Sequence, residues 1–468
     1  MSKYGKLVKN SVLFAMANVG SYFISFVLVR FYTELLSTEQ YGMIDFLTVT
    51  ATLVIPVFTL SIVEAVLRFS IDRTNIEEVF NNGIGVSIAG SIAFGVVGGI
   101  FFSATRYSEY FGFLAVYVFI CNINNVCLQY VRGTGRVVPF AVSGIIKSAF
   151  LAISNIVFLL GFGWKIRGYL ISLILSELAS VVFLVCSGRL WKIWTFRMNL
   201  PLCKEMLTYS IPLIPTALSW WVMNASDKYV IIAVLGPAAA GIYAVSHKIP
   251  TLINLCNKVF FQAWQLSAVE EADSSQKSLF YSGVFNTLAL FLMLAANLLL
   301  LFLRPLMHLL SAEAFSESWK YAPFLIISLV FSAFASFLGT NYVAMKKTKG
   351  AFKSTLFGVA VNLALNFALI HPLGMTGTAI ATMIGFAATW IYRIFDTKQF
   401  ISISYKPVSL IAALSCLILQ GCVLVTEQPF AVYFGLFSLL VICILYRSET
   451  LKLCRAFASM ISSRLKNR

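Results

Sequence analysis

Two charged residues lie inside an apolar run that is long enough to cross a bilayer. The run SIPLIPTALSWWVMNASDKYVIIAVLG, near 208–234, carries Asp227 and Lys228. An ionised side chain at membrane depth costs about 3 kcal/mol or more, so it faces a cavity or a partner. The pair therefore indicates either a functional site or an ion pair with a neighbouring helix.

Polar side chains recur at helical spacing in several other apolar runs, which places them on one face of each helix. They are Asn122, Asn125, Gln129 and Arg132; Ser143, Lys147 and Ser154; Ser172, Ser176, Glu177 and Ser180; His247, Thr251, Asn254 and Lys258; and Asn362 with Asn366. Asn, Ser and Thr in membrane helices also bond neighbouring helices, at about 1 kcal/mol each. Polar faces on several helices contain more polar groups than helix–helix bonding requires, and they therefore predict a water-filled cavity.

The ionisable residues expected in or beside this cavity carry a positive surplus, which favours an anionic substrate such as a phosphate. The cations are Lys147, Lys228, Lys248, Lys258, Arg30 and Arg68, and the anions are Glu64, Glu177 and Asp227. Alternatively, Lys258 and Arg68 reach the inner surface by snorkelling, so that the surplus rests mainly on Lys147 and Lys248. Arg68 also has the alternative of pairing with Glu64 along one helix. Glu177 and Asp227 are either protonatable coupling groups or counter-ions of Lys147 and Lys228.

The composition indicates an all-α polytopic membrane protein. The 468 residues are 59% hydrophobic and 12% charged, and the mean hydropathy of +0.86 lies far outside the soluble range. Apolar windows predict about fourteen spans, with twelve as the main competing count. They lie near 11–33, 43–68, 83–104, 112–131, 138–161, 168–187, 208–234, 241–262, 281–303, 321–344, 354–371, 374–395, 408–426 and 430–446.

Membrane topology explains the net charge of +16 better than nucleic-acid binding does. Most of the 35 lysines and arginines fall in alternate short loops, so the positive-inside rule places both termini in the cytoplasm. The basic start precedes an uncleaved first span rather than a signal peptide. The chain has no P-loop or H-E-x-x-H motif, its nine cysteines form no C-x-x-C pair, and its three histidines are dispersed. We therefore expect no enzyme activity, cofactor, disulfide framework or metal site.

A weak internal repeat appears when the chain is shifted by 199 residues, which places Leu36 on Leu235 and Gly42 on Gly241. Each copy starts a block of six spans, and because six is even the blocks are parallel. Two parallel blocks around a substrate are a known transporter plan. The expected domains are a six-helix bundle at 1–187, a cytoplasmic linker at 188–207, a second bundle at 208–400, and two extra helices with a basic tail at 401–468.

Several segments carry a resemblance to a known family: NSVLFA with LSTEQYG, IPLIP with SDKYVI and AGIYAVSHKI, FQAWQL, and NLALNFALIHPLGMTGTAIAT. Over essentially its whole length the chain resembles the bacterial polysaccharide flippases of the O-antigen transporter type. Their superfamily also contains MATE exporters and lipid II flippases. Asp227 and Lys228 match the family's Asp–basic pair, although Arg is commoner at the second position, and Arg68 matches the basic residue of its second span.

The resemblance implies two pseudo-symmetric six-helix bundles around a central cavity, plus a C-terminal hairpin. It also implies transport of undecaprenyl-pyrophosphate-linked oligosaccharide, for O-antigen or another surface polysaccharide, to the outer leaflet of the bacterial inner membrane. The alternatives are a MATE-like drug or cation antiporter, a peptidoglycan-precursor flippase, and a non-transporting scaffold for glycosyltransferases. The expected partners are the lipid-linked oligosaccharide, membrane lipid, a polysaccharide polymerase and glycosyltransferases.

We hypothesise alternating access in which 11–187 rocks against 208–395, with H⁺ or Na⁺ as the coupling ion. Asp227, Glu177 and Glu64 are assigned to ion coupling. The residues assigned to substrate binding are Lys147, Lys228, Lys248, Arg68, Arg30, Asn122, Asn125, Gln129, His247, Asn254, Asn362 and Asn366.

Overall fold

A computed structural model describes residues 24–451 apart from 25, 73–74, 106, 196, 271–276, 345–347 and 400. The predicted first span at 11–33 lies mostly outside the described residues, as does most of the predicted basic tail. The chain divides into two compact units, and each is described by itself. The first comprises Met1–Ile232, Gly236–Gly241 and Leu310–Ala314, and the second comprises Ala233–Leu235, Ile242–Leu309 and Phe315–Arg468. The predicted domain boundaries concern bodies that move during transport and stay a prediction.

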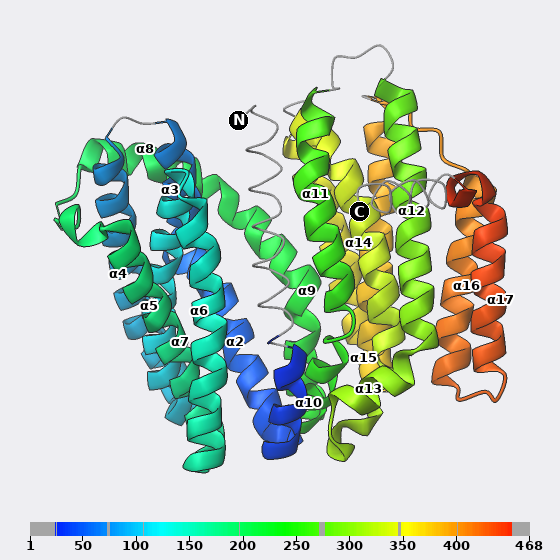
Figure 1. Cartoon of the computed structure of the whole chain (residues 1–468), viewed down its shortest axis with the longest axis horizontal. Coiled ribbons are helices and arrows are strands. Elements are labelled where there is room, and N and C mark those ends of the chain that lie inside the picture. The colour runs from blue at the N-terminus through cyan, green and yellow to red at the C-terminus, as the bar shows by residue number, and fades with distance from the viewer. Residues whose placement is uncertain are drawn as a thin grey trace, which may run out of the picture. The chain divides into compact units, whose positions relative to one another are not determined.

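The first unit is a bundle of long helices that run roughly alongside one another (Figure 1). Its core lies where α3, α4, α5 and α8 meet, around Phe80, Val126 and Met206, none of which is exposed. Its helices are α2 (Thr38–Phe58), α3 (Ile62–Asp72), α4 (Ile76–Ser103), α5 (Ser108–Gly133), α6 (Val137–Asn155), α7 (Lys165–Gly188), α8 (Leu200–Ser210), most of α9 (Ile214–Leu235) and the first turn of α10 (Pro237–Ser246). A π-helical turn, Ile156–Gly161, extends α6.

The second unit is also helical throughout its described part. Its helices, besides the rest of α10, are α11 (Thr251–Glu270), α12 (Lys277–Leu301), α13 (Leu303–Leu310), α14 (Ala322–Ala344), α15 (Thr348–Thr397), α16 (Pro407–Val425) and α17 (Ala431–Leu445). A left-handed Gly374, with φ of 56°, turns the chain inside α15. The side-chain amide of Asn362 then reaches Thr382 Oγ1 at 3.3 Å, so the predicted spans 354–371 and 374–395 pack as a hairpin.

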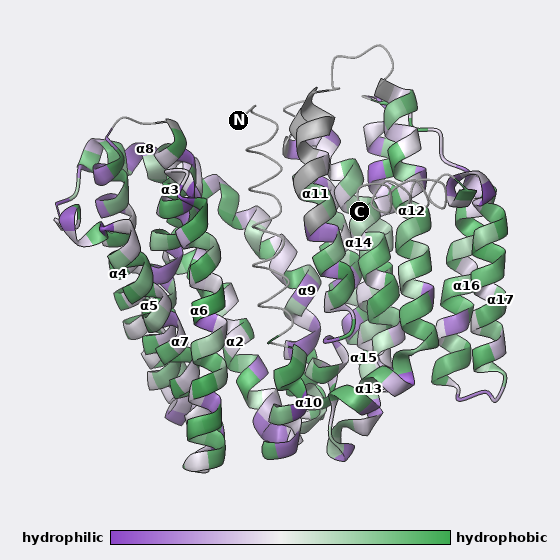
Figure 2. Cartoon of the chain, in the orientation of Figure 1, coloured by the Kyte–Doolittle hydropathy of each residue, from purple (hydrophilic) through white to green (hydrophobic). Residues whose placement is uncertain are grey.

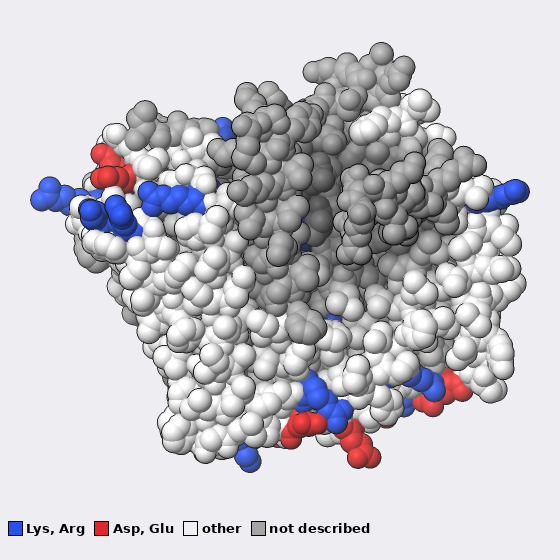
Figure 3. All heavy atoms as spheres, in the orientation of Figure 1, with Lys and Arg blue, Asp and Glu red and all other residues white. Residues whose placement is uncertain are grey.

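Both units carry the surface of a membrane protein. Among the described residues, nine helices are long and apolar enough to cross a bilayer. In Figure 2 most residues of α16 and α17 are hydrophobic, and α4 exposes Val96, Val97 and Phe101. On the side seen in Figure 3, charged side chains lie mostly near the helix ends and leave uncharged atoms between them. The protein therefore spans the membrane several times, as predicted. The count of fourteen spans and the cytoplasmic placement of the termini stay predictions.

The structure interrupts two spans that the sequence predicted as continuous. The span at 43–68 is broken between Phe58 and Ile62, and the span at 241–262 is broken by a turn at 247–250. Hydropathy could not show either break, because both lie within stretches that stay largely apolar. Interrupted membrane helices are tolerated where the freed backbone groups lie against protein or a water-filled cavity.

The repeat-related glycines contact one another reciprocally within the first unit. A Cβ on Gly42 would lie 2.0 Å from the Pro237 carbonyl oxygen, and a Cβ on Gly241 would lie 1.9 Å from the Thr38 carbonyl oxygen. The 199-residue shift that places Gly42 on Gly241 also places Thr38 on Pro237. Each copy of the repeat therefore makes the same contact with the other, which is the geometry of a local two-fold axis.

A buried arginine joins α14 to both halves of the α15 hairpin. Arg393 is 3% exposed, and it donates to the Ala335 carbonyl at 2.6 Å, to Ser354 Oγ at 2.9 Å and to Thr355 Oγ1 at 2.9 Å. All three acceptors are neutral, so the guanidinium is held by hydrogen bonds. Its planar fork suits several fixed acceptors better than the single ammonium of lysine does.

We expect Arg393→Met to lower the free energy of unfolding by roughly 3 kcal/mol, because it leaves several buried acceptors without their donor. Arg393→Lys should restore less than half of that loss. Lys398→Met, which removes an exposed cation near the end of the same helix, is the matched control and should change little. Thermal unfolding in detergent micelles measures all three variants. Equal melting temperatures for Arg393→Met and wild type would contradict the role assigned to Arg393.

Candidate functional site

A buried charge pair joins α6 to α7. The Lys147 ammonium forms an ion pair with the Glu177 carboxylate, which is not exposed. The Asn124 side-chain amide of α5 donates to the same carboxylate at 2.6 Å, and the Ser180 hydroxyl donates to Asn124 Oδ1 at 2.9 Å. Glu177 is therefore the counter-ion of Lys147, which is one of its two predicted roles. Its part in ion coupling stays a prediction.

A second ion pair joins α9 to α2. The Lys228 ammonium lies 2.8 Å from Asp45 Oδ2, with the two side chains 12% and 15% exposed. The neighbouring Asp227 is 2% exposed, and its carboxylate accepts a hydrogen bond from the Lys228 backbone amide at 2.9 Å. The sequence predicted either a functional site or an ion pair with a neighbouring helix for this dipeptide. For Lys228 the geometry shows the ion pair.

We expect Lys228→Met to lower the free energy of unfolding by roughly 3–5 kcal/mol, because it leaves the Asp45 carboxylate buried without its cation. Combining Lys228→Met with Asp45→Asn should recover most of the loss, since no unpaired charge then remains. Melting temperatures of the solubilised variants measure the effect. If the single variant melted like the wild type, the ion pair would contribute nothing to stability.

A cavity of about 510 Å³ lies in the first unit, lined by α2, α3, α5 and α9 and by the turns beside them. Its polar lining residues are Thr59, Ser61, Glu64, Asn125, Gln129, Thr216 and Trp220, and its apolar ones are Ile55, Pro56, Val63, Leu213 and Ala217. The fold thus brings together three predicted site residues, Glu64, Asn125 and Gln129.

Two carboxamides of this cavity, those of Asn125 and Gln129, make few hydrogen bonds with the described residues. Gln129 Oε1 is buried and accepts no hydrogen bond from the residues described. The Asn125 amide donates to Cys121 Sγ at 3.7 Å, and sulfur is a weak acceptor. Within the same part of the chain Glu64 forms no ion pair, so the alternative pairing with Arg68 is not made. Buried polar groups without partners are costly in a membrane, and they mark candidate ligand sites.

The break between α2 and α3 forms one wall of the cavity. Leu60 and Ser61 both have φ of 52°, in the left-handed region that residues other than glycine rarely adopt. Such residues cost about 1–3 kcal/mol each and persist where the surroundings require them. The break brings Ser61 and Glu64 to the cavity. It packs closely against α4, where a Cβ on Gly90 would lie 2.3 Å from the Phe58 carbonyl oxygen.

Three predicted asparagines form hydrogen bonds within or between helical segments instead of lining this cavity. Asn122 donates to Ser91 Oγ of α4 at 2.8 Å. In α15, Asn366 donates to Asn362 Oδ1 at 3.1 Å, and Asn362 in turn donates across the hairpin to Thr382. The bonds of Asn122 and Asn362 are the helix–helix hydrogen bonds that the sequence left open as an alternative. The assignment of these residues to substrate binding stays a prediction.

The remaining predicted residues lie away from the cavity lining. Arg30 pairs with Glu34 at 2.6 Å and donates to the Ser311 carbonyl at 2.7 Å. The others are exposed or lie in a turn: Arg68 is exposed on α3, His247 and Lys248 lie between α10 and α11, and Asn254 is exposed on α11. Among the residues described, no group of three His, Cys, Asp or Glu side chains could hold a metal ion.

The sequence reasoning missed four residues that the structure places at these sites. Asp45 is an ionisable residue inside a predicted span, so the rule that singled out Asp227 also applies to it. Asn124 lies beside the predicted polar face of α5 and faces α7 instead. Thr216 and Trp220 are four residues apart on α9, which places them on one face, but only the fold shows that this face lines the cavity.

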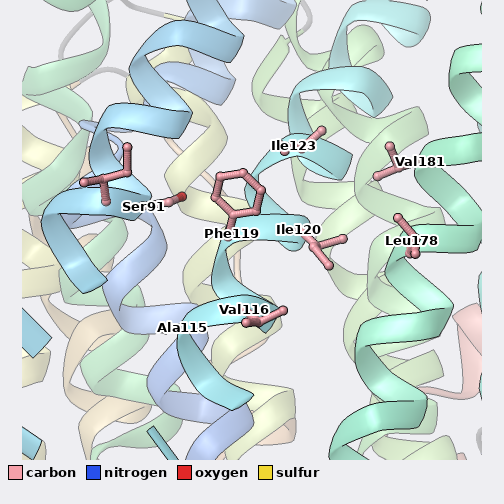
Figure 4. Close-up of a pocket in the computed structure, with 9 residues that line it drawn as sticks. Ser91, Ala115, Val116, Phe119, Ile120, Ile123, Leu178 and Val181 are labelled. Atoms are coloured by element: carbon pink, nitrogen blue, oxygen red, sulfur yellow. The ribbon is translucent and has the colours of Figure 1, made fainter. Parts of the chain in front are cut away.

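A second hollow of the first unit, of about 540 Å³, has the opposite chemistry (Figure 4). Side chains of α4, α5 and α7 line it, among them Val116, Phe119 and Leu178. Its one polar lining residue is Ser91, whose hydroxyl already accepts a hydrogen bond from Asn122. This hollow offers nothing to a sugar or a phosphate, and its surface suits hydrocarbon chains.

Comparison with known proteins gives one family and one fold. Residues 7–265, more than half of the chain, match the sequence model of a family described as polysaccharide biosynthesis protein. An uncharacterised membrane protein of Methanocaldococcus jannaschii is 22% identical over 422 residues, which cover 83% of this chain and 97% of that protein.

Three solved structures share the fold. A lipid II flippase, MurJ, in an inward closed conformation is similar with a TM-score of 0.70 over 96% of this chain and 100% of that one, at 12% identity. An inward-facing MATE multidrug transporter of the MOP superfamily is similar with a TM-score of 0.65 over 81% of this chain and 94% of that one, at 16% identity. A MOP superfamily transporter from Pyrococcus furiosus is similar with a TM-score of 0.61 over 84% of this chain and 95% of that one, at 15% identity. The predicted fold class is therefore confirmed.

Proposed function

Because the chain belongs to the polysaccharide biosynthesis protein family, we propose that it is a flippase for lipid-linked oligosaccharides. It moves undecaprenyl-pyrophosphate-linked repeat units, of O-antigen or another surface polysaccharide, from the inner to the outer leaflet of the bacterial inner membrane. The fold, shared with a lipid II flippase and with multidrug transporters, supports a transport function. A polysaccharide polymerase and glycosyltransferases would act after and before it.

The observation that carries the proposal is the polar cavity inside a bundle whose exterior is apolar. Carboxamide, carboxylate and hydroxyl groups line the cavity, and these groups exchange hydrogen bonds with sugar hydroxyls. The outside of the same unit suits lipid chains. A molecule with a hydrophilic head and a long hydrocarbon tail matches both surfaces at once.

The proposed mechanism is alternating access by rocking of residues 11–187 against 208–395, with the polyprenyl tail remaining in lipid. Cationic residues hold the pyrophosphate. Lys147 is the first candidate, because its side chain is 38% exposed even though it pairs with Glu177. If the ammonium exchanged Glu177 for a phosphate oxygen, the buried carboxylate would take up a proton, since an isolated charge is costly there. That exchange would couple substrate binding to proton binding.

The membrane potential favours the same direction of transport. An inside-negative potential drives an anion outward by about 2.3 kcal/mol per charge per 100 mV. The coupling ion, H⁺ or Na⁺, returns the carrier to its inward-facing state. Asp227 and Glu64 are further candidates for binding that ion, because each carries an acidic side chain inside a membrane-spanning unit.

A strain that lacks the protein tests the proposal. Lipid-linked repeat units should collect on the inner leaflet, where externally added enzymes cannot reach them, and the wild-type gene should restore their outward movement. Lys147→Ala should fail to restore it although the protein still reaches the membrane. Normal delivery in the deletion strain would contradict the flippase assignment. Recovery by Lys147→Ala would instead remove Lys147 from the site.

A cation antiporter is the second candidate, and Glu64 in the cavity is the observation that favours it. An antiporter would raise resistance to cationic drugs when overproduced and would leave lipid-linked saccharides unmoved. Measuring both properties in one strain separates the two functions. We expect unchanged drug resistance, because Glu64 is the only acidic residue among the described residues that line the cavity.

A further inference from the structure

We propose that the 510 Å³ cavity of the first unit is a sugar-binding subsite, in which Trp220 stacks on one pyranose ring while Glu64, Asn125 and Gln129 bind its hydroxyls. The inference rests on the proposed function and assigns the two parts of the substrate head group to two different places. The cavity binds the saccharide, and the pyrophosphate of the same molecule binds elsewhere. The volume lies within the range of roughly 300–1,000 Å³ that is usual for small-molecule sites.

The hydrogen-bonding groups of the cavity match a polyol. A sugar hydroxyl both donates and accepts, so it needs acceptors and donors together. Glu64 supplies carboxylate acceptors, and the carboxamides of Asn125 and Gln129 supply both kinds of group. Gln129 Oε1, buried and without a donor among the described residues, is already positioned to accept from a ligand. Ser61 and Thr59 add hydroxyl groups at the broken helix.

Two regular helices, α5 and α9, supply lining side chains of the cavity. Asn125 and Gln129 are four residues apart on α5, and Thr216 and Trp220 are four residues apart on α9, so each pair lies on one helical face. Trp220 brings an indole to a cavity that also carries these polar groups. An indole face covers the C–H surface of a sugar ring, while the ring hydroxyls point outward to polar partners.

The neighbouring tryptophan, Trp221, contacts a different part of the first unit. Trp221 donates its indole N–H to the Val49 carbonyl and to Thr52 Oγ1, each at 3.2 Å, and so ties α9 to α2. Trp220 lies one residue earlier, and therefore on a different face of α9, and it lines the cavity instead. The two adjacent residues thus form a natural pair of test and control positions.

The charge of the cavity favours binding of a neutral sugar over binding of a phosphate. Among the described residues, its lining includes one carboxylate and neither lysine nor arginine. A pyrophosphate in this cavity would be repelled by the Glu64 carboxylate, and no cation stands among the described lining residues to offset the repulsion. Lys147 and Lys228 lie outside this lining. A neutral saccharide is therefore the part of the substrate that the cavity suits.

Binding to the purified full-length protein in lipid nanodiscs tests the subsite with two probes. One is the lipid-linked oligosaccharide extracted from cells that lack the protein, and the other is undecaprenyl pyrophosphate, which has no sugar. We expect the wild type to bind the first at least about tenfold more tightly. Trp220→Ala, Gln129→Leu and Glu64→Gln should reduce this ratio to within about twofold, with the affinity for undecaprenyl pyrophosphate unchanged.

Trp221→Ala and Asn224→Leu are the matched controls on α9, since neither residue lines the cavity. Both should keep the tenfold ratio. The subsite is overturned if the three cavity variants keep the ratio, if they weaken both probes equally, or if the wild type shows no preference for the sugar-bearing lipid. A change that appears only in sodium or proton dependence would show that Glu64 binds a cation instead. Translocation by the wild type, measured separately, shows whether the flippase function itself holds.

Discussion

Lys147→Ala abolishes transport in our expectation, and it also lowers the stability of the first unit. The substitution removes the cation that faces Glu177, a carboxylate with no solvent exposure that also accepts from Asn124. Breaking a buried pair in this way costs about 3–5 kcal/mol. Leaflet exchange of lipid-linked oligosaccharide measures the first effect, and melting in detergent measures the second.

A double variant separates the two effects of losing Lys147. Lys147→Met with Glu177→Gln leaves no unpaired charge, and the new glutamine can still accept from Asn124. We expect it to melt near the wild-type temperature and yet not to transport, because both exchangeable charges are gone. Transport by the double variant at the wild-type rate would show that the pair is only structural. Normal transport by Lys147→Ala would remove the pair from the mechanism altogether.

Gly42→Ala and Gly241→Ala should each disrupt the first unit, and to a similar extent. At both positions a Cβ would come within about 2 Å of a backbone carbonyl oxygen of the other helix, so α2 and α10 must separate. Overpacking of this kind costs about 1–3 kcal/mol, or more where only backbone atoms can move. Because the two contacts are reciprocal, the double variant should lose much less than the sum of the single losses.

Gly95→Ala is the matched control for this pair of glycines. It lies inside α4, and a Cβ there would meet no atom within 4 Å. Alanine is the better helix former, so this variant should be as stable as the wild type or slightly more stable. Melting temperatures and transport rates of the four variants are compared. If Gly42→Ala behaved like Gly95→Ala, the close contact between the repeats would have no importance.

Hydropathy predicted the helices well because a bilayer requires long apolar segments whatever their neighbours are. It failed at the break around Leu60 and Ser61. Neither residue is a glycine, and the apolar pattern continues through the break, so only packing against Gly90 and the cavity makes the interruption visible. The same limit applies to the turn at 247–250.

The candidate site could be predicted only in part. Helical spacing placed Asn122, Asn125 and Gln129 on one face of α5, but the structure divides that face between a hydrogen bond to Ser91 and the cavity. Spacing gives a direction on a helix and does not say which helix lies opposite. The ion pair between Lys228 and Asp45 joins residues 183 positions apart, which no local pattern can show. The family resemblance added the expected substrate class, but it did not show which residues bind the substrate.

The movement of lipid-linked oligosaccharide across liposomes that contain only the purified protein tests the central claim most directly. The labelled glycolipid starts in one leaflet, and an enzyme added outside reports how much becomes accessible with time. We predict exchange well above the rate in protein-free liposomes and near that rate with Lys147→Ala. Wild-type liposomes that exchange the glycolipid no faster than protein-free ones, although the protein is folded and inserted, would contradict the account.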